Sequence, residues 1–411
     1  MFPSVVYQMF DCGCLTWNVT VAGPRRVRAR TPCQTQRGEI VKRLVPLGLL
    51  AALALAACGG GGSSKSSSTT TSTAAPAAGL DVGNPASPVT LNESGASLLF
   101  PFLQELVTPL HDKYPNITLA PAAGGSGKGI SDAIAGLVQM GGSDAYLSNG
   151  QLAQNPGLMN IPIAVSAQAV NYNLPGVANL KLSGDILAKI YQGAIKKWND
   201  PAISALNSGV TLPATTIIPV RRVDSSGDTF LFTSFLSATN SQWQSGPGFS
   251  TTVTWPPAPG ELTAQGNPGM VQTCKANPGC VAYVGVSAEA AAQQAGLGEA
   301  MLQNKAGNFL QPTSDTINAA VTAAGTTVPA NLAVSLIYLP GAQSYPIVNF
   351  EYIIVKSTQP SADVAKAIRT FLAFAIDPSG GSTTALLSKE NFVALPSSII
   401  PKVNAAIAKV T

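Results

Sequence analysis

The feature that most constrains the fold is the alternation of short β-prone runs with amphipathic helical stretches. Expected strands lie at residues 89–94, 117–122, 215–223 and 348–355. Expected helices lie at residues 98–114, 127–140, 183–195, 229–240 and 361–376. Such alternation is typical of α/β proteins in which helices cover layered, mainly parallel sheets. About 330 residues of globular composition exceed what one core usually serves, so we expect two domains.

The N-terminal region predicts export and lipid attachment. In residues 41–57, Lys42 and Arg43 precede an apolar run that is too short to span a bilayer permanently, and the run ends at Cys58. This pattern predicts a lipoprotein signal peptide at residues 41–57, lipidation of Cys58 and anchoring on the outer face of the cell membrane. Because a signal peptide works from the N-terminus, we interpret residues 1–40 as a non-native leader before the true start.

Composition argues against a nucleic-acid partner. Residues 58–84 follow the signal peptide and consist largely of Gly, Ser, Thr and Ala, which predicts a flexible tether behind the lipidated cysteine. Removing residues 1–57 leaves 24−7 = 17 basic and 20−2 = 18 acidic groups, a net charge of −1. A nearly neutral chain has no electrostatic reason to bind nucleic acid.

Two cysteines remain in the expected globular part. Cys274 and Cys280 flank a turn-like segment, and an even pair in an exported protein predicts a disulfide that closes a small loop. A zinc site would need more ligands, and the single histidine, His111, lies far away in sequence. We therefore expect neither a metal nor a cofactor.

Three Gly- and Ser-rich loops each follow an expected strand and precede an expected helix. They span residues 93–102, 121–130 and 222–230 and carry the hydroxyl groups of Ser97, Ser126 and Ser226. Helix N-termini present unpaired backbone N–H groups and the positive end of the helix dipole, so they bind anions. Glycine lets the backbone approach a ligand closely. Together, the three loops predict a site for a small anion.

Charged residues near these loops fit an anion site. Arg221 or Arg222 can fork onto two oxygens of a tetrahedral anion, with Asp224 as the ion-pair partner of one of them. Asp144 lies in a further turn of small residues, after an expected helix and an expected short strand. An ionised aspartate only accepts hydrogen bonds, so beside an anion it requires a ligand that carries an O–H group.

Several segments in order along residues 88–400 resemble the PstS family, the phosphate-binding subunits of high-affinity phosphate ABC importers, and above all its mycobacterial lipoproteins. They include GASLLFP, GSGKGI, GGSDAYLS, IYQGAIKKWNDPAI, RRVDSSGDTFLFT and YPIVNFEYIIV. The resemblance implies a bilobed type II periplasmic binding protein with mixed sheets, whose two lobes are joined by two hinge crossings. It implies lobe I at residues 85–167 and 347–411, and lobe II at residues 168–346.

The resemblance also implies roles for individual residues. The expected phosphate-binding residues are Ser97, Leu98 through its backbone N–H, Ser126, Gly127, Asp144, Arg222, Ser226, Gly227 and Asp228, with Asp224 as ion-pair support for the arginine. Asp228 departs from the enteric pattern, which has threonine there. Two alternatives remain open for it: a second ligand-facing acceptor that favours dihydrogen phosphate, or a carboxylate satisfied by local amides and Ser126.

The function expected is that of a monomeric, lipid-anchored solute-binding protein that delivers inorganic phosphate to the permease subunits of an ABC importer. The alternative is a binding protein for another oxyanion or an organophosphate. An enzyme is not expected, because the chain has no G-x-S-x-G motif and only one histidine.

Overall fold

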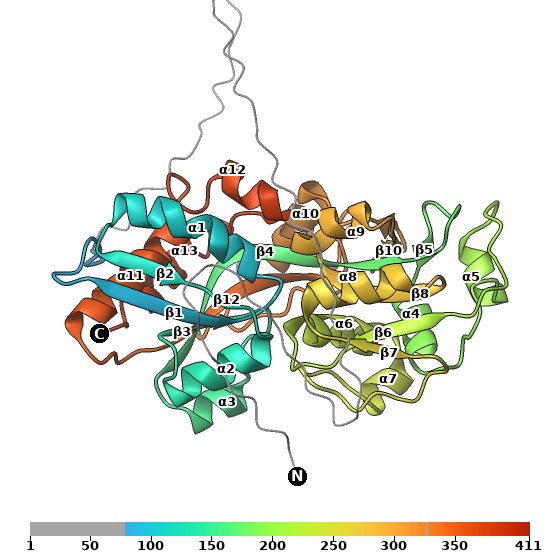
Figure 1. The fold of residues 1–411 in the computed structure, drawn as a ribbon, viewed down its shortest axis with the longest axis horizontal. Helices are drawn as coiled ribbons and strands as arrows, with labels where there is room; N and C mark the ends of the chain where they lie inside the picture. Colours follow the sequence, from blue (N-terminus) through green and yellow to red (C-terminus); the bar gives the residue numbers. More distant parts are fainter. Residues whose placement is uncertain (1–78, 326–327) are drawn as a thin grey trace, which may run out of the picture. The chain divides into compact units, whose positions relative to one another are not determined.

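The computed structural model describes residues 79–325 and 328–411 (Figure 1). The predicted leader, signal peptide, lipidation at Cys58 and most of the tether lie outside these residues. The strands are β1 Val89–Gly95, β2 Ile117–Ala120, β3 Met140–Ser143, β4 Leu158–Tyr172, β5 Lys181–Leu182, β6 Ile218–Arg222, β7 Leu262–Ala264, β8 Cys280–Gly285, β9 Gly298–Glu299, β10 Met301–Gln303, β11 Phe309–Leu310 and β12 Val348–Lys356.

Helices connect and cover these strands. They are α1 Phe100–Lys113, α2 Ser126–Ala135, α3 Asn149–Gln154, α4 Gly184–Tyr191, α5 Pro201–Leu206, α6 Gly227–Thr239, α7 Ser241–Ser245, α8 Gly266–Ala276, α9 Glu289–Gln294, α10 Ser314–Ala324, α11 Ala362–Ile376, α12 Thr384–Leu387 and α13 Ile400–Ile407. Most predicted strands and helices are present with ends within a few residues of the expected ones.

The main sheet has the strand order β2-β1-β3-β12-β4-β8-β6-β7, with β9 also paired to β4. The pairs β1–β2, β1–β3, β6–β7 and β6–β8 are parallel. The pairs that β12 makes with β3 and β4, and those that β4 makes with β8 and β9, are antiparallel. The sheet is therefore mixed. The expectation of a mainly parallel sheet, drawn from the alternation alone, is wrong because β4 and β12 run antiparallel to their neighbours.

Strand β4 connects two halves of this sheet. Its residues 158–167 pair with β12, and its residues 168–172 pair with β8. The predicted crossings at residues 167/168 and 346/347 fall at this change of partner and just before β12 begins. The division into two lobes itself stays a prediction.

The second predicted helix, residues 127–140, is wrong at its end. Helix α2 stops at Ala135 because Gly136 adopts a left-handed conformation with φ 71°, which suits a residue without a Cβ. Residues 140–143 instead form β3, which pairs with both β1 and β12. Strand β3 is the short strand expected before Asp144, although its sequence MGGS contains no alternating apolar pattern.

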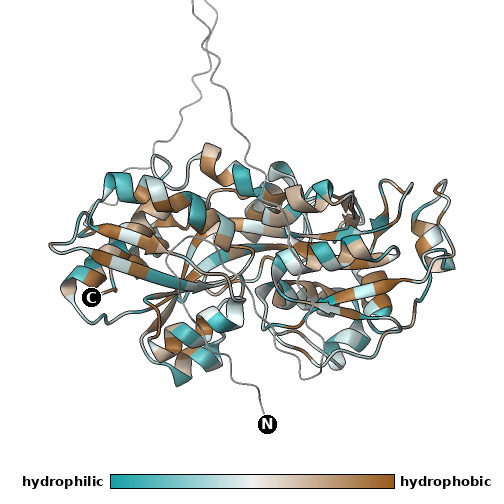
Figure 2. Ribbon diagram, in the orientation of Figure 1, coloured by the Kyte–Doolittle hydropathy of each residue, from teal (hydrophilic) through white to brown (hydrophobic). Residues whose placement is uncertain are grey.

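The hydrophobic core lies on the central strands. All but one of the residues of β4, and all but the last of β12, are buried, so both faces of these strands are covered. Figure 2 shows hydrophobic residues concentrated on the strands and a mixture of hydrophobic and hydrophilic residues along the helices. Within residues 79–325 and 328–411, no helix has both the length and the apolar character needed to cross a membrane.

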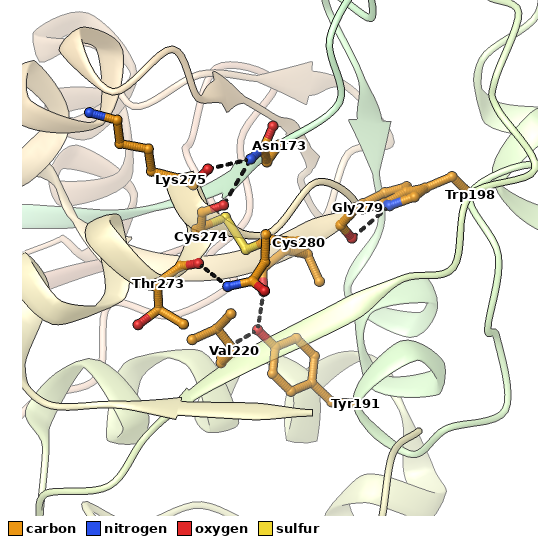
Figure 3. The surroundings of a disulfide bond; sticks show 11 residues. Asn173, Tyr191, Trp198, Val220, Thr273, Cys274, Lys275, Gly279 and Cys280 are labelled. Atoms are coloured by element: carbon orange, nitrogen blue, oxygen red, sulfur yellow. Dashed lines mark hydrogen bonds between the residues drawn. A yellow bond between two sulfur atoms is a disulfide. The ribbon is translucent and has the colours of Figure 1, made fainter. Parts of the chain in front are cut away.

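Cys274 and Cys280 form a disulfide between the end of α8 and the first residue of β8, with their Cα atoms 5.3 Å apart (Figure 3). The loop that it closes is held by further hydrogen bonds. The Asn173 side chain donates to the carbonyl of Cys274 at 2.9 Å, and the indole N–H of Trp198 donates to the carbonyl of Gly279 at 2.9 Å. The disulfide therefore fixes the start of β8 beside the end of α8, and the Asn173 hydrogen bond ties this loop to the residue that follows β4.

Candidate functional site

The predicted loops meet between the two halves of the sheet. The strands β1, β2 and β3 run parallel to one another, and so do β6, β7 and β8. The antiparallel pairs of β12 and β4 set the two groups in opposite directions, so the loops that follow one group face those that follow the other. Helices α2 and α6 begin there, at Ser126 and Gly227. The Gly127 N–H donates to the carbonyl of Ser225 at 2.9 Å, which joins the second predicted loop directly to the third.

Ser126 and Asp144 form the first buried pair of the site. The Ser126 hydroxyl donates to Asp144 Oδ2 at 3.3 Å and accepts the Asp144 backbone N–H at 3.1 Å. Gly227 lies directly against both side chains: a Cβ on this residue would collide with Asp144 Oδ2 and Ser126 Oγ. Only glycine therefore lets the first turn of α6 approach Asp144 so closely.

Arg222, the last residue of β6, is the buried cation of the site. Its Nε donates to Asp224 Oδ1 at 2.8 Å, one terminal nitrogen donates to Asp228 Oδ2 at 2.6 Å, and the other donates to Asp224 Oδ2. Burial alone would lower the pKa of Arg222, but the hydrogen-bonded Asp224 and the charge of Asp228 outweigh it and raise the pKa. Arg222 is therefore a permanent cation.

Two N–H groups of this guanidinium remain for a ligand. A guanidinium carries five N–H donors in a rigid fork. Three are engaged by Asp224 and Asp228, and the other two, one on each terminal nitrogen, have no acceptor among the described residues. Such a pair of donors matches two oxygens of a tetrahedral anion.

Both oxygens of Asp228 accept hydrogen bonds from side chains. Oδ2 accepts from Arg222 and from Asn267 Nδ2 at 3.0 Å, and Oδ1 accepts from Gln168 Nε2 at 3.1 Å. Burial raises the pKa of Asp228, while the charge of Arg222 opposes this shift. Of the two alternatives left open for Asp228, the structure favours a carboxylate satisfied by the protein, but the donors are Arg222 and two amides distant in sequence. Ser126 pairs with Asp144 instead.

The remaining predicted residues lie around this cluster. Ser226 caps α6, because its hydroxyl oxygen accepts the Thr229 backbone N–H at 3.3 Å. Ser97 Oγ accepts the Asn267 backbone N–H at 3.2 Å. The Leu98 carbonyl accepts from the Ser287 hydroxyl at 2.8 Å, and the Leu98 side chain packs on Gly285. The phosphate-binding roles of all the predicted residues stay predictions.

Asn267, at the start of α8, was missed by sequence reasoning. It links two predicted residues, since its backbone N–H reaches Ser97 and its side chain reaches Asp228. It also accepts the Gly285 N–H at 3.0 Å. The only signal in the sequence is its place beside a glycine, Gly266, which opens α8 with a φ of 64°.

Glu351 on β12 was also missed, although its sequence context is informative. It is the one charged residue within the apolar run VNFEYIIV, and the structure buries it completely. Its Oε1 accepts from the Ser166 hydroxyl at 2.5 Å and from Asn349 Nδ2 at 2.8 Å. Burial raises the pKa of Asp144 well above its usual value, and the nearby charges of Glu351 and Asp228 raise it further.

A mixed sheet covered by helices, with strand-to-helix loops around a buried arginine, fits a solute-binding protein of the PBP superfamily. The domain model of that superfamily matches residues 65–379 of this chain. The PstS phosphate-binding protein of Pasteurella multocida is 33% identical over 318 residues, which cover 77% of this chain and 89% of that protein. The chain belongs to the PstS family.

Two further comparisons agree with this assignment. PstS3 of Mycobacterium bovis is 33% identical over 376 residues, covering 88% of this chain and 96% of the relative. A solved high-affinity periplasmic phosphate-binding protein (PfluDING), bound with phosphate at pH 8.5, superposes with a TM-score of 0.61 at 22% identity, covering 78% of this chain and 93% of that one. The expected type II periplasmic-binding-protein fold is confirmed.

Proposed function

We propose that this chain is an extracytoplasmic binding protein that captures inorganic phosphate and delivers it to an ABC permease. The observation that carries the proposal is that Asp224 and Asp228 hold the buried Arg222 with two N–H groups unused, near enough to Asp144 for the charge of Arg222 to lower the pKa of that carboxyl. The family relatives named for phosphate binding support the same ligand.

Directed hydrogen bonds, rather than net charge, attract the anion. Arg222 with its two carboxylates sums to a charge of −1, so the cluster has no excess positive charge. The attraction comes from the guanidinium fork and from the N-termini of α2 and α6, where backbone N–H groups and the helix dipole favour an anion. These groups are already oriented before binding, which reduces the reorganisation that binding requires.

Asp144 selects for an anion that carries a proton. Phosphate near neutral pH bears at least one O–H, which donates to a carboxyl oxygen, whereas sulfate bears none. A sulfate would leave a buried acceptor facing another acceptor, and sites of this kind discriminate by about 10⁴-fold or more. Arsenate shares the geometry and protonation of phosphate, so it is expected to bind as well.

The test is calorimetric titration of the purified protein with phosphate and with sulfate at pH 7. Tight phosphate binding with sulfate weaker by about 10⁴-fold is expected. Equal affinities would favour a general oxyanion-binding protein. Failure to bind either anion, together with phosphate release from a chromogenic ester, would favour an enzyme instead.

Anchoring through Cys58 completes the proposal. It is supported by the signal-peptide pattern of residues 41–57 and by the cysteine that follows it. Metabolic labelling with a fatty-acid analogue tests it: label is expected in the wild type and absent from Cys58→Ala. Equal labelling of both would place the lipid elsewhere.

A further inference from the structure

Glu351 lies behind the ligand-facing side of Asp144. Strands β3 and β12 are antiparallel with Ser143 opposite Tyr352, so the next position along the pair sets Asp144 opposite Glu351. The ladder between β12 and β4 shifts register between Glu351 and Tyr352. Such β-bulges re-aim side chains next to functional sites. Here the bulge coincides with a buried glutamate that points to Ser166 and Asp144.

Each of the two carboxyl groups has one oxygen without a donor. Asp144 Oδ1 and Glu351 Oε2 are buried and receive no N–H or O–H from the described residues. The two residues face each other across the β3–β12 pair, and each carboxyl group shifts the pKa of the other. Two facing carboxylate oxygens can form a hydrogen bond only if one carries a proton, and adjacent buried carboxylates do not both ionise. One proton shared by Asp144 Oδ1 and Glu351 Oε2 satisfies both.

The surroundings assign the negative charge of the pair to Glu351. Glu351 Oε1 receives donors from Ser166 and Asn349, whereas Asp144 Oδ2 receives only the longer bond from Ser126. Burial raises the pKa of both groups. The charges of Glu351 and Asp228 raise the pKa of Asp144 further, while hydrogen bonds from Ser166 and Asp144 lower that of Glu351. The proton therefore resides on Asp144.

The other ionisable groups around the pair come from four elements, β6, α6, β12 and α2. Arg222 and Asp228 lie on the ligand side and act on Asp144 with opposite sign. Tyr352, next to Glu351 on β12, donates its hydroxyl to the Leu332 carbonyl at 3.1 Å. On α2, which packs against β12, Lys128 and Asp132 pair with each other at 2.6 Å.

We propose that Glu351 is a positioning residue that determines anion specificity: it binds the proton of Asp144 on the side away from the ligand. Asp144 Oδ2 can then only accept a hydrogen bond, and the negative charge lies one side chain farther from the anion. Without Glu351, a protonated Asp144 is free to turn its proton toward the ligand and donate to sulfate. The proposal rests on phosphate as the ligand.

The test is Glu351→Gln, with sulfate competition against labelled phosphate measured from pH 5 to 8. The glutamine oxygen can keep the bonds from Ser166 and Asn349, so its amide nitrogen donates to Asp144 Oδ1. Any proton on Asp144 must then lie on Oδ2, facing the ligand. Sulfate itself does not change protonation in this range. We expect the variant's affinity for sulfate to rise at least tenfold on going from pH 8 to pH 5, with no such rise in the wild type.

A matched control is Glu299→Gln. Glu299 also belongs to a carboxyl pair, with the buried Glu289, although Glu299 itself is only partly buried, and it lines a separate cavity of about 720 Å³. This variant should keep the wild-type ratio of sulfate to phosphate affinity at every pH. A Glu351→Gln variant with that same constant ratio overturns the proposal. A wild type that binds no phosphate contradicts the proposed function instead, so the two failures are distinguishable.

Should Glu351→Gln fail to fold, infrared spectroscopy of the wild type tests the same idea. A protonated-carboxyl absorption at pH 7 that shifts on adding phosphate, and that is missing from Asp144→Asn, supports a proton on Asp144. A wild-type spectrum without any phosphate-sensitive protonated-carboxyl band overturns it.

Discussion

Arg222 and Asp228 meet at 2.6 Å, and each side chain is only 1% exposed to solvent. Asp224 engages the same guanidinium from the other side, so one buried cation is fixed between two carboxylates. Breaking a buried ion pair by removing one partner is strongly destabilising, because the remaining charge is left uncompensated. The cluster therefore affects both the stability of the fold and the affinity of the site.

Replacing Arg222 with lysine should weaken phosphate binding by about 100-fold, because two charge-assisted hydrogen bonds of about 1.5 kcal/mol each are lost. It should also lower the free energy of unfolding by about 3 kcal/mol, since a lysine cannot reach both carboxylates in the same fork. Calorimetry and urea denaturation measure the two effects.

The neighbouring Arg221→Lys is the control. Because Arg221 pairs with Glu261 in a partly exposed site, this variant should change the free energy of unfolding by less than about 1 kcal/mol. Equal losses in both variants would contradict a special role for Arg222.

Asp228→Asn should lower the free energy of unfolding by about 3 kcal/mol and leave the shape of the pH profile of phosphate binding unchanged. The reason is that Arg222, Gln168 and Asn267 already satisfy both carboxylate oxygens, so the ligand proton has no free acceptor there. Calorimetric phosphate titrations from pH 5 to 8 on both proteins decide the matter. A profile that changes shape in the variant would return Asp228 to the role of ligand-facing acceptor.

The raised pKa of Glu93 predicts that the free energy of unfolding falls as the pH rises. Burial raises its pKa from 4.5 to about 8, although backbone N–H groups of Ala122 and Gly142 oppose the shift. Between these values the folded state holds a proton that the unfolded state has released. The free energy of unfolding therefore falls as pH rises through this window, by at most about 1.4 kcal/mol per pH unit from this group.

Urea denaturation of the wild type and Glu93→Gln at pH 5, 6.5 and 8 tests this slope. The variant should show a flatter dependence. Glu299, whose pKa is also raised to about 8, contributes with the same sign, so a double variant should be flatter still. An unchanged slope in Glu93→Gln would mean that Glu93 is ionised in the folded state.

Removing the disulfide should cost about 2 kcal/mol, because it closes a loop of only six to seven residues in the unfolded chain. The Cys274→Ala, Cys280→Ala double variant tests this by thermal denaturation, with the reduced wild type as a second measurement. Phosphate affinity should stay within about twofold of the wild type, since Asn173 and Trp198 hold the same loop through hydrogen bonds. A large loss of affinity would show that the loop is coupled to the site.

Local patterns in the sequence were enough to predict the loops of the site. Ser126 and Arg222 were expected because a hydroxyl residue or an arginine at a strand-to-helix junction is a local signal for an anion, whereas the roles of Asp144 and Gly227 rest on the resemblance. The structure brings Ser126, Asp144 and Gly227 together, with Arg222 near enough for its charge to lower the pKa of Asp144. The roles of Ser97 and Leu98 rest on the resemblance, and the structure places them beside Asn267 and Gly285.

The missed residues depend on distant pairing. Gln168 reaches Asp228 across 60 residues of sequence, and Asn267 does so across 39. Glu351 faces Asp144 only because β12 pairs with β3 in one particular register. Such contacts follow from sheet order, which no local pattern encodes. A short strand before Asp144 was expected, but the limits of β3 were not, because its glycine-rich sequence is a strand only through its two neighbours.

The pairing of β4 with β12 has a consequence for the order of folding. The two strands are neighbours at the centre of the sheet, yet residues 173–347 lie between them in sequence. During synthesis β4 leaves the ribosome long before its central partner exists, and closing so long a loop is entropically slow. Residues 173–347 must therefore be synthesised, and β4 must stay able to pair with β12, before the centre of the sheet can form. Glu351 arrives with β12, so the buried carboxyl pair is among the last parts of the site to assemble.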